Sequence, residues 1–376
     1  MTSTNKNSLP YLPQLDSLRA LAVLGVFVQH FLSQGNIFVS TVPLGDLGVR
    51  MFFVLSGFLI TGILLNARAG IRSGSISKAT TTWHFYMRRF LRLFPVFYVS
   101  LAVGLIFSQE LREYIWWFIL YLQNIQNARL GHFSFGAHLW TLAVEEQFYL
   151  VWPLFIFFIS DRLLWPTMVL TMVLGVVSRV VFIGLDLTHF QASMLTPSHL
   201  DTLGAGGVLA ILYAQREKLS EQFSRTLRLC FLAGLTLLFV VFTTKLAGFP
   251  STPEFILGEL GAGLVFMWVI GNAAIGFRGP LGWVLDMSLL QYLGKISYGL
   301  YVYHYFVPRI ALTIAERTGV VVPGSEWVQF LLYSTVSILI AMVSWHLMEQ
   351  PILALKKKFS YERLPAIRMP HEPAGA

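Results

Sequence analysis

The sequence predicts an all-α protein that crosses a membrane many times, and its composition is the first reason. Of its 376 residues, 55% are hydrophobic and only 12% are charged, about half the roughly 25% charged fraction of an average soluble protein. So few charges cannot cover the surface of a soluble chain of this length, which argues against a cytosolic enzyme and a disordered protein. The single cysteine, Cys230, excludes an internal disulfide, a cysteine-rich zinc site and an iron–sulfur cluster.

Long apolar runs are the second reason, because a helix needs roughly 17–25 residues to cross the hydrocarbon layer. We predict about ten spans, at residues 18–34, 47–65, 92–109, 139–159, 164–184, 199–214, 229–246, 255–275, 290–312 and 327–348. One further run, 114–125, is apolar but short. We interpret it as a re-entrant or interfacial helix, with an eleventh span as the alternative.

The distribution of basic residues is the third reason, and it sets the direction of the spans. Lys and Arg gather in segments 66–92 and 215–228 and in the tail after residue 355. With ten spans, all three segments lie on the same side as the N-terminus, so the positive-inside rule favours ten spans with both termini cytoplasmic. The net charge of +8 then reflects orientation in the bilayer and does not indicate nucleic-acid binding. We expect tails at 1–14 and 356–376 around a membrane domain at 15–355.

The first span places Arg19 and His30 on one helix face. They are eleven residues apart, which returns the helix to within ~20° of its starting direction and rises ~16 Å. Imidazole exchanges a proton near neutral pH, so His30 is a candidate general base. The alternative is a buried neutral histidine that bonds to a neighbouring helix.

The third span begins with an arginine cluster of Arg88, Arg89 and Arg92. Arg89 and Arg92 are three residues apart and are therefore neighbours on a helix surface, whereas Arg88 faces away from them. Guanidinium groups bind phosphate through paired hydrogen bonds, so the pair is a candidate clamp for a phosphorylated ligand. The alternative is positive-inside anchoring.

The fourth span contains two adjacent carboxylates, Glu145 and Glu146. Ionised carboxylates inside a membrane are costly unless they are paired, and Arg179 in the next span is a candidate partner. The alternative is a structural ion pair. His132 and His138 lack a matching carboxylate or cysteine, so we predict no metal site. Intramembrane His, Arg and Glu also form proton relays in transporters, which makes a transporter or flippase the rival class.

Seven motifs in this order resemble acyltransferase family 3, a family of integral membrane acyltransferases, from about residue 11 to residue 355. They are LDSLRALAVLGVFVQH from residue 15, DLGVRMFFVLSGFLIT from 46, RRFLRLFPVFY from 88, LWTLAVEEQFYLVWPL from 139, HLDTLGAGGVLA from 199, GKISYGLYVYHYF from 294 and MEQP from 348. Two positions depart from the family pattern. His199 stands where Arg is frequent, and Ser17 stands where Gly is common.

The resemblance implies transfer of an acyl group, usually acetyl, from cytoplasmic acyl-CoA (acetyl-CoA in most members) to a hydroxyl of a carbohydrate or glycoconjugate. It implies a stand-alone form, without an SGNH-type esterase domain, in the bacterial inner membrane. Acceptors among relatives include O-antigen, exopolysaccharide, peptidoglycan, Nod factors and macrolides. The residues that it points to are His30, Glu145 and Glu146 for catalysis, Arg19, Arg88, Arg89 and Arg92 for acyl-CoA, and Arg179, Asp201, Tyr298 and His304 for the acceptor. Direct attack on the thioester and an acyl-histidine intermediate both remain open.

Overall fold

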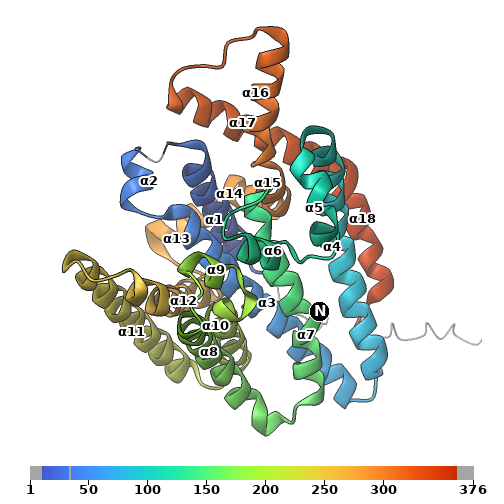
Figure 1. Cartoon of the computed structure of the whole chain (residues 1–376). Coiled ribbons are helices and arrows are strands. Elements are labelled where there is room, and N and C mark those ends of the chain that lie inside the picture. The colour runs from blue at the N-terminus through green and yellow to red at the C-terminus, as the bar shows by residue number, and fades with distance from the viewer. Residues whose placement is uncertain (1–10, 34, 362–376) are drawn as a thin grey trace, which may run out of the picture.

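The protein is a bundle of helices, and its computed structural model describes residues 11–33 and 35–361. No described residue lies in a β-strand, which confirms the all-α prediction. In Figure 1, α3 and α10 lie in the middle of the bundle, α11 and α12 on one side, and α4 and α18 on the other. Most of the predicted N-terminal tail and the end of the C-terminal tail lie outside the described residues.

The helices are of two kinds, long and short. The long ones are α1 (Pro13–Phe31), α3 (Leu44–Arg72), α4 (Lys78–Phe107), α7 (Trp140–Phe158), α8 (Asp161–Gly184), α10 (Leu200–Gln215), α11 (Ser220–Leu246), α12 (Thr252–Ile275) and α17 (Glu326–Ser344). The short ones are α2 (Ile37–Thr41), α5 (Gln109–Ile119), α6 (Gln123–Leu130), α9 (His189–Met194), α13 (Gly279–Leu285), α14 (Ser288–Lys295), α15 (Ser297–Tyr303), α16 (Phe306–Thr318) and α18 (Gln350–Ala354). Three 3₁₀ turns (Ala137–Leu139, Thr196–His199, Leu355–Phe359) and a π-helical turn (Trp345–Glu349) complete the chain.

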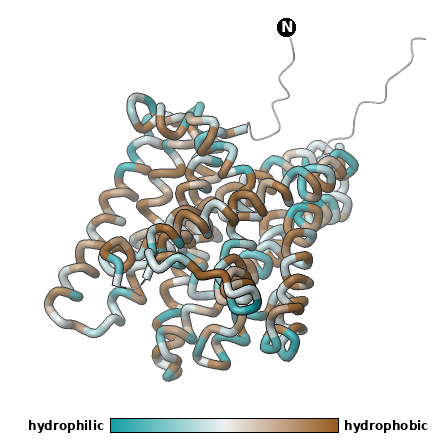
Figure 2. The backbone as a smooth tube through the Cα atoms, turned by 90° about the horizontal axis from the view of Figure 1, so that it is seen from above, coloured by the Kyte–Doolittle hydropathy of each residue, from teal (hydrophilic) through white to brown (hydrophobic). Residues whose placement is uncertain are grey.

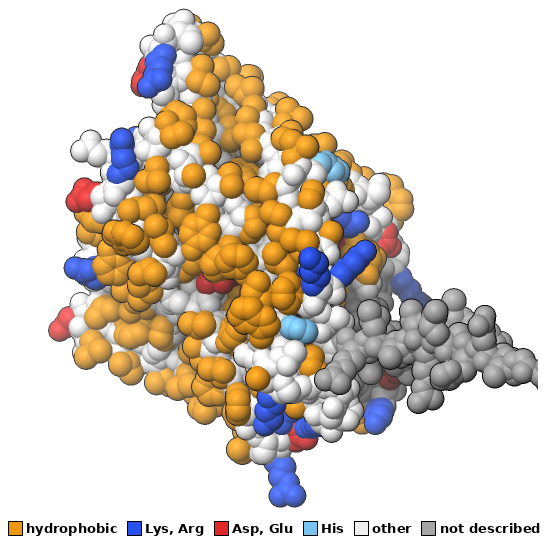
Figure 3. Space-filling view, turned by 90° about the vertical axis from the view of Figure 1, so that its right-hand side faces the viewer, with side chains coloured by type: hydrophobic (Ala, Val, Ile, Leu, Met, Phe, Trp, Pro, Cys, Tyr) orange, Lys and Arg blue, Asp and Glu red, His pale blue; other side chains and the backbone are white. Residues whose placement is uncertain are grey.

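Seven helices of the described chain are long and apolar enough to cross a membrane. They are Leu44–Arg72, Lys78–Phe107, Ala137–Phe158, Asp161–Gly184, Ser220–Leu246, Thr252–Ile275 and Glu326–Phe359, and they coincide with seven of the predicted spans. Hydrophobic side chains cover much of the face in Figure 3, with charged ones mostly near its margins. The tube in Figure 2 is hydrophobic along most of the long helices. This surface is typical of a protein that faces lipid.

The other three predicted spans are not among these seven helices. Most of segment 18–34 lies in α1, which is 19 residues long, begins at Pro13 and carries Asp16 and Arg19 in its first two turns. Segment 199–214 forms α10, whose 16 residues are almost all buried between other helices. The prediction of one helix over 290–312 is wrong, because the chain leaves helical geometry at Ile296 (ψ 4°) and turns again after Tyr303, giving α14, α15 and α16.

The short run 114–125 does not form a spanning helix. It divides between α5 and α6, and the chain turns at Tyr121, which has φ 53°. The 11 residues of α5 rise only ~16 Å, about half the hydrocarbon thickness. The structure therefore favours the short-helix interpretation of this run over an eleventh span.

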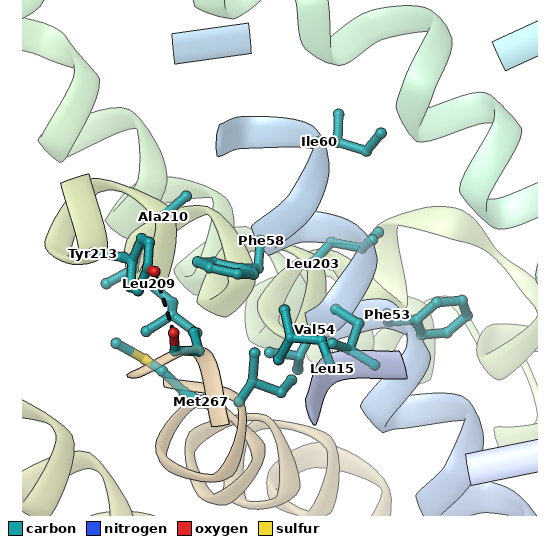
Figure 4. Packing of buried hydrophobic residues seen from close by; sticks show 14 of the residues in the cluster. Leu15, Phe53, Val54, Phe58, Ile60, Leu203, Leu209, Ala210, Tyr213 and Met267 are labelled. Atoms are coloured by element: carbon teal, nitrogen blue, oxygen red, sulfur yellow. Dashed lines mark hydrogen bonds between the residues drawn. The ribbon is translucent and has the colours of Figure 1, made fainter. Parts of the chain in front are cut away.

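Helices α3 and α10 approach each other closely because both present glycine at the crossing. A Cβ atom on Gly57 would lie 2.0 Å from the carbonyl oxygen of Leu203, and one on Gly206 would lie 2.2 Å from that of Val54. Small residues allow this approach of two backbones, as in other membrane helix pairs. Figure 4 shows Phe58 of α3 beside Leu209 of α10 in the hydrophobic cluster that surrounds the crossing.

The three basic segments share one end of the bundle. Arg72 lines a surface cavity together with Gln215 and Gln222, which brings segments 66–92 and 215–228 together. Arg88 donates hydrogen bonds to the carbonyl oxygens of Lys356 and Phe359, which brings the C-terminal segment to the same end. This arrangement is the one that the ten-span topology requires.

Candidate active site

Two cavities lie along α1, and the first is cationic. We call it the arginine cavity; its volume is about 210 Å³, and Arg19 of α1 and Arg89 and Arg92 of α4 line it. The neighbouring turns of α4 bring Arg89 and Arg92 to the same side, as their spacing predicts. Its other polar lining residues are Ser56, Thr141, Glu145, Tyr149, Ser297, Tyr298 and Tyr301.

Positive charge in the arginine cavity exceeds negative charge. Among the described residues, neither Arg89 nor Arg92 forms an ion pair within 4.0 Å, and Arg19 has only a loose contact of 3.8 Å with Asp16. The one carboxylate that lines the cavity is Glu145, which accepts a hydrogen bond from Ser56. Unpaired guanidinium groups in a low-dielectric region favour an anionic ligand, and phosphate fits their geometry.

Arg88 points to a different part of the molecule. Its Nη1 donates to the carbonyl oxygens of Lys356, at 3.4 Å, and Phe359, at 3.3 Å, and its guanidinium lies 5.2 Å from the ring centre of Tyr361. The sequence predicts that Arg88 faces away from Arg89 and Arg92, and the structure agrees. Its contacts hold the C-terminal segment against α4.

The second cavity, which we call the histidine cavity, is larger and lies farther along α1. Its volume is about 650 Å³, and His30, His138 and His199 line it. Aromatic side chains supply part of the wall, and charged side chains supply another part. The aromatic residues include Phe133, Trp140, Phe190, Phe255 and Tyr305, and the charged ones are Asp46, Arg50, Arg179, Glu254 and Glu259. A cavity that combines aromatic walls with a few polar groups is typical of small-molecule sites.

The two cavities meet at a common wall. Val49, Phe53 and Tyr301 line both of them, so we call these three residues the neck. Arg19 faces one cavity and His30 the other, and α1 rises ~16 Å between them. The two cavities are therefore neighbours, with Arg19 lining one and His30 lining the other.

A chain of hydrogen bonds fixes the imidazole of His30. His304 Nδ1 lies 2.7 Å from the carbonyl oxygen of Tyr301, which can only accept, so this nitrogen carries a proton. In a neutral ring His304 Nε2 then accepts, and it lies 2.8 Å from His30 Nδ1, which donates. His30 Nε2 is left with a free lone pair, the form that a general base requires.

The predicted pairing of Arg179 with Glu145 or Glu146 is wrong. Glu145 accepts a hydrogen bond from Ser56 and lines the arginine cavity, and Glu146 Oε1 is buried without a partner among the described residues. Arg179 lines the histidine cavity instead. It binds Asp201 with both terminal nitrogens, at 3.1 and 2.6 Å.

The other predicted residues take distinct positions. Tyr298 lines the arginine cavity and donates to the carbonyl oxygen of Leu93 at 2.7 Å. His304 is fully buried behind His30. Asp201 is fully buried against Arg179. None of these three lines the histidine cavity; of the predicted residues, His30 and Arg179 do.

Arg50 and Glu259 also line the histidine cavity, although they are not among the site residues predicted from the sequence. Arg50 Nε lies 2.7 Å from Glu259 Oε1, and Glu259 Oε2 lies 3.7 Å from His199 Nδ1, so these groups form a polar chain along the histidine cavity. A charge inside an apolar run is rare and indicates function or pairing, and that signal was available for both Arg50 and Glu259. Within the described chain, no group of three or more His, Cys, Asp or Glu residues could hold a metal ion.

Comparison with known proteins identifies the family. A family model described as an acyltransferase domain matches residues 12–346. The chain belongs to this acyltransferase family. All residues that line the two cavities lie within the matched range.

Curated relatives of the family are named as O-acetyltransferases. The chain is 30% identical to the peptidoglycan O-acetyltransferase OatA of Listeria monocytogenes, over 94% of this chain and 57% of that protein. It is 29% identical to the O-acetyltransferase OatA of Staphylococcus aureus, over 91% of this chain and 57% of that protein. The chain thus spans a little over half the length of these relatives. No solved structure matches it.

Proposed function

We propose that this chain is a membrane-embedded O-acetyltransferase that moves an acetyl group from acyl-CoA in the arginine cavity to a carbohydrate hydroxyl in the histidine cavity. The observation that carries the proposal is the junction of the two cavities at the neck, with His30 just beyond it. One cavity fits an anion, and the other offers a base with a free lone pair. Family membership supports acyl transfer as the reaction class.

The donor is acyl-CoA, because its phosphates match the unpaired guanidinium groups. Arg89 and Arg92 lie near the middle of α4 and line the arginine cavity, and Arg19 adds a third positive charge. The extended arm of CoA passes the neck and presents its thioester to His30. The names of the relatives, which are O-acetyltransferases, support acetyl as the group that this donor carries.

The chemical step uses His30 as general base. His30 Nε2 takes the proton of the acceptor hydroxyl while the hydroxyl oxygen forms a bond to the thioester carbonyl carbon. The carbon–sulfur bond then breaks, and the CoA thiolate leaves and takes up the proton from the imidazolium. His304 stabilises the productive orientation through its 2.8 Å contact with His30 Nδ1. A positioned base of this kind contributes typically 10²–10⁴-fold.

In the topology that we propose, donor and acceptor reach the protein from opposite sides of the bacterial inner membrane. The seven apolar helices would supply seven of ten crossings, and α1, α10 and the broken segment 290–312 would supply the other three, with both termini cytoplasmic. The basic segments at one end of the bundle support this orientation. The acceptor enters the histidine cavity from the other side, where cell-wall glycan lies, and the name of the Listeria relative supports peptidoglycan as its class.

Transfer across a vesicle membrane tests the proposal. The purified full chain is placed in liposomes with acetyl-labelled acetyl-CoA on one side and glycan strands built on N-acetylglucosamine on the other. We expect label on the glycan as a base-labile ester. The rival transporter would move unmodified solute and leave the glycan unlabelled, and that result would overturn the proposal.

Loss of one cavity arginine is expected to weaken donor binding. Arg92→Gln removes a charge-assisted contact to phosphate, so the KM for acetyl-CoA is expected to rise about tenfold to a hundredfold, with a smaller change in kcat. Steady-state kinetics at saturating glycan measure both quantities. Arg88→Gln is the matched control, since it removes the same charge from the same helix but outside the cavity. An equal rise in the KM for acetyl-CoA in both variants would mean that the arginines attract the donor through their positive charge alone, without a specific contact in the cavity.

A further inference from the structure

His138 is a buried histidine that the chemical step leaves unused. It lies in the 3₁₀ turn before α7, is 3% exposed, and lines the histidine cavity. Its Nε2 lies 3.1 Å from the carbonyl oxygen of Val302, so Nε2 carries the proton and donates. In a neutral ring, Nδ1 is then a lone-pair acceptor, and it has no partner among the described residues.

The position of His138 ties it to the reacting centre. Its ring centroid lies 4.9 Å from that of His304, which bonds His30, and it stacks on Tyr305 at 4.9 Å. Tyr305 also contacts the His30 ring edge-on, at 5.7 Å. His30 and His138 therefore face the same part of the histidine cavity.

Gln29 supplies a second unused acceptor beside His30. It precedes His30 in α1 and lines the same cavity, and its side-chain oxygen Oε1 is buried without a partner. A buried acceptor with no donor is destabilising, because it has lost its hydrogen bond to water without replacing it. His138 and Gln29 both line the cavity and each holds one such atom, so a ligand that brings hydrogen-bond donors to these two side chains would satisfy both.

We propose that His138 Nδ1 and Gln29 Oε1 accept hydrogen bonds from acceptor hydroxyls that neighbour the one activated by His30. Both atoms can only accept, so they fit hydroxyl donors and do not fit a carboxylate or a phosphate. The cavity thus selects a polyhydroxylated sugar over a simple alcohol. This inference rests on the proposed function and deepens it by assigning the residues that recognise the acceptor.

Two variants of His138 distinguish the proposed role of Nδ1 in sugar binding from the role of Nε2 in the hydrogen bond to Val302. His138→Gln keeps a nitrogen that can donate to Val302 but removes the Nδ1 acceptor, whereas His138→Asn keeps a polar acceptor near Nδ1 and loses the Val302 bond. For N-acetylglucosamine tetrasaccharide, we expect His138→Gln to raise KM about tenfold, the worth of one hydrogen bond, and to change kcat much less. His138→Asn is expected to stay near the wild-type KM.

Deoxy analogues of the tetrasaccharide identify the hydroxyl. For the wild type, the analogue that lacks the hydroxyl bound by His138 is expected to have a KM about tenfold higher than the tetrasaccharide. In His138→Gln the same analogue is expected to cause no further rise in KM, because both changes remove the same hydrogen bond. If His138→Gln binds every analogue as the wild type does, Nδ1 holds only water and the inference is overturned. Equal losses in the Gln and Asn variants would also overturn it, because they would indicate a structural role.

A binding measurement without acetyl-CoA keeps this inference separate from the proposed function. Tetrasaccharide affinity is measured by calorimetry on the full chain in detergent. If His138→Gln lowers tetrasaccharide affinity about tenfold while the wild type transfers no acetyl group, the sugar-binding role of His138 would stand and the enzymatic function would be rejected. Unchanged affinity in an active enzyme would retain the enzyme and reject the role of His138.

Discussion

His30→Ala is expected to lower the rate of acetyl transfer by about 10²–10⁴-fold, the usual contribution of a positioned general base. The His30 side chain lines the histidine cavity and is oriented by its hydrogen bond to His304. The variant therefore loses the imidazole nitrogen that acts as the base. The KM for acetyl-CoA is expected to change little, because the arginines bind the anionic part of the donor and Arg19 lies ~16 Å from His30 along α1. Single-turnover transfer to N-acetylglucosamine tetrasaccharide measures the loss directly.

His304 offers a graded comparison for the same prediction. It contacts His30 but is fully buried and does not line either cavity, so it acts as a positioning residue. His304→Gln is expected to cost less than His30→Ala and to alter the pH profile of kcat, because the partner of His30 Nδ1 changes. An active His30→Ala enzyme would remove His30 from the mechanism. A loss in His304→Gln with an unaltered pH profile would indicate packing alone.

The same experiment separates direct attack from an acyl-histidine intermediate. Direct attack requires the acceptor, so labelled acetyl-CoA alone leaves the protein unlabelled. An acyl-histidine intermediate would accumulate label on His30 Nε2 in the absence of the tetrasaccharide. The free lone pair of that nitrogen serves either route, since it can take a proton or attack the thioester.

Local patterns in the sequence were enough to predict seven of the helices and several of the polar residues. Length and hydropathy located the seven apolar helices, and helical spacing placed Arg89 and Arg92 in one cavity and Arg88 outside it. Arg19 and His30 lie along one helix, so their relation also followed from spacing alone. In each case the relevant geometry lies within one helix, where it depends only on the rise and turn per residue.

Contacts between helices were not predictable in the same way. His30 and His304 are 274 residues apart, and Arg179 meets Asp201 across two helices. The sequence offered Glu145 and Glu146 as partners for Arg179, because charge alone ranks all carboxylates alike. Gly294 and Gly299 flank the break of segment 290–312 at Ile296, but glycine is frequent in membrane helices and therefore did not predict the break. Tertiary packing decides these features, and it leaves no periodic signal in the chain.

Arg179→Met is expected to destabilise the protein by about 3–5 kcal/mol, the usual cost of removing one partner of a buried ion pair. Both side chains are 0% exposed. The five N–H donors of Arg179 are used by the protein itself, on Asp201 and on the carbonyl oxygens of Ser198 and Ile256. Without Arg179, Asp201 remains as an uncompensated buried charge. Reversible unfolding in mixed micelles measures the free-energy difference.

The double variant Arg179→Met with Asp201→Leu decides between a structural and a binding role for this pair. Replacing both charges by apolar side chains is often neutral for stability, so the double variant is expected to recover most of the loss caused by Arg179→Met. The sequence predicts that Arg179 and Asp201 bind the acceptor, and in that case the recovered protein would show a raised KM for the tetrasaccharide. The saturated hydrogen bonds of Arg179 leave no donor for a sugar, so we expect the acceptor KM to stay near the wild-type value. A stable double variant with a strongly raised KM would restore the binding role, and continued instability would show that the ion pair has no apolar substitute.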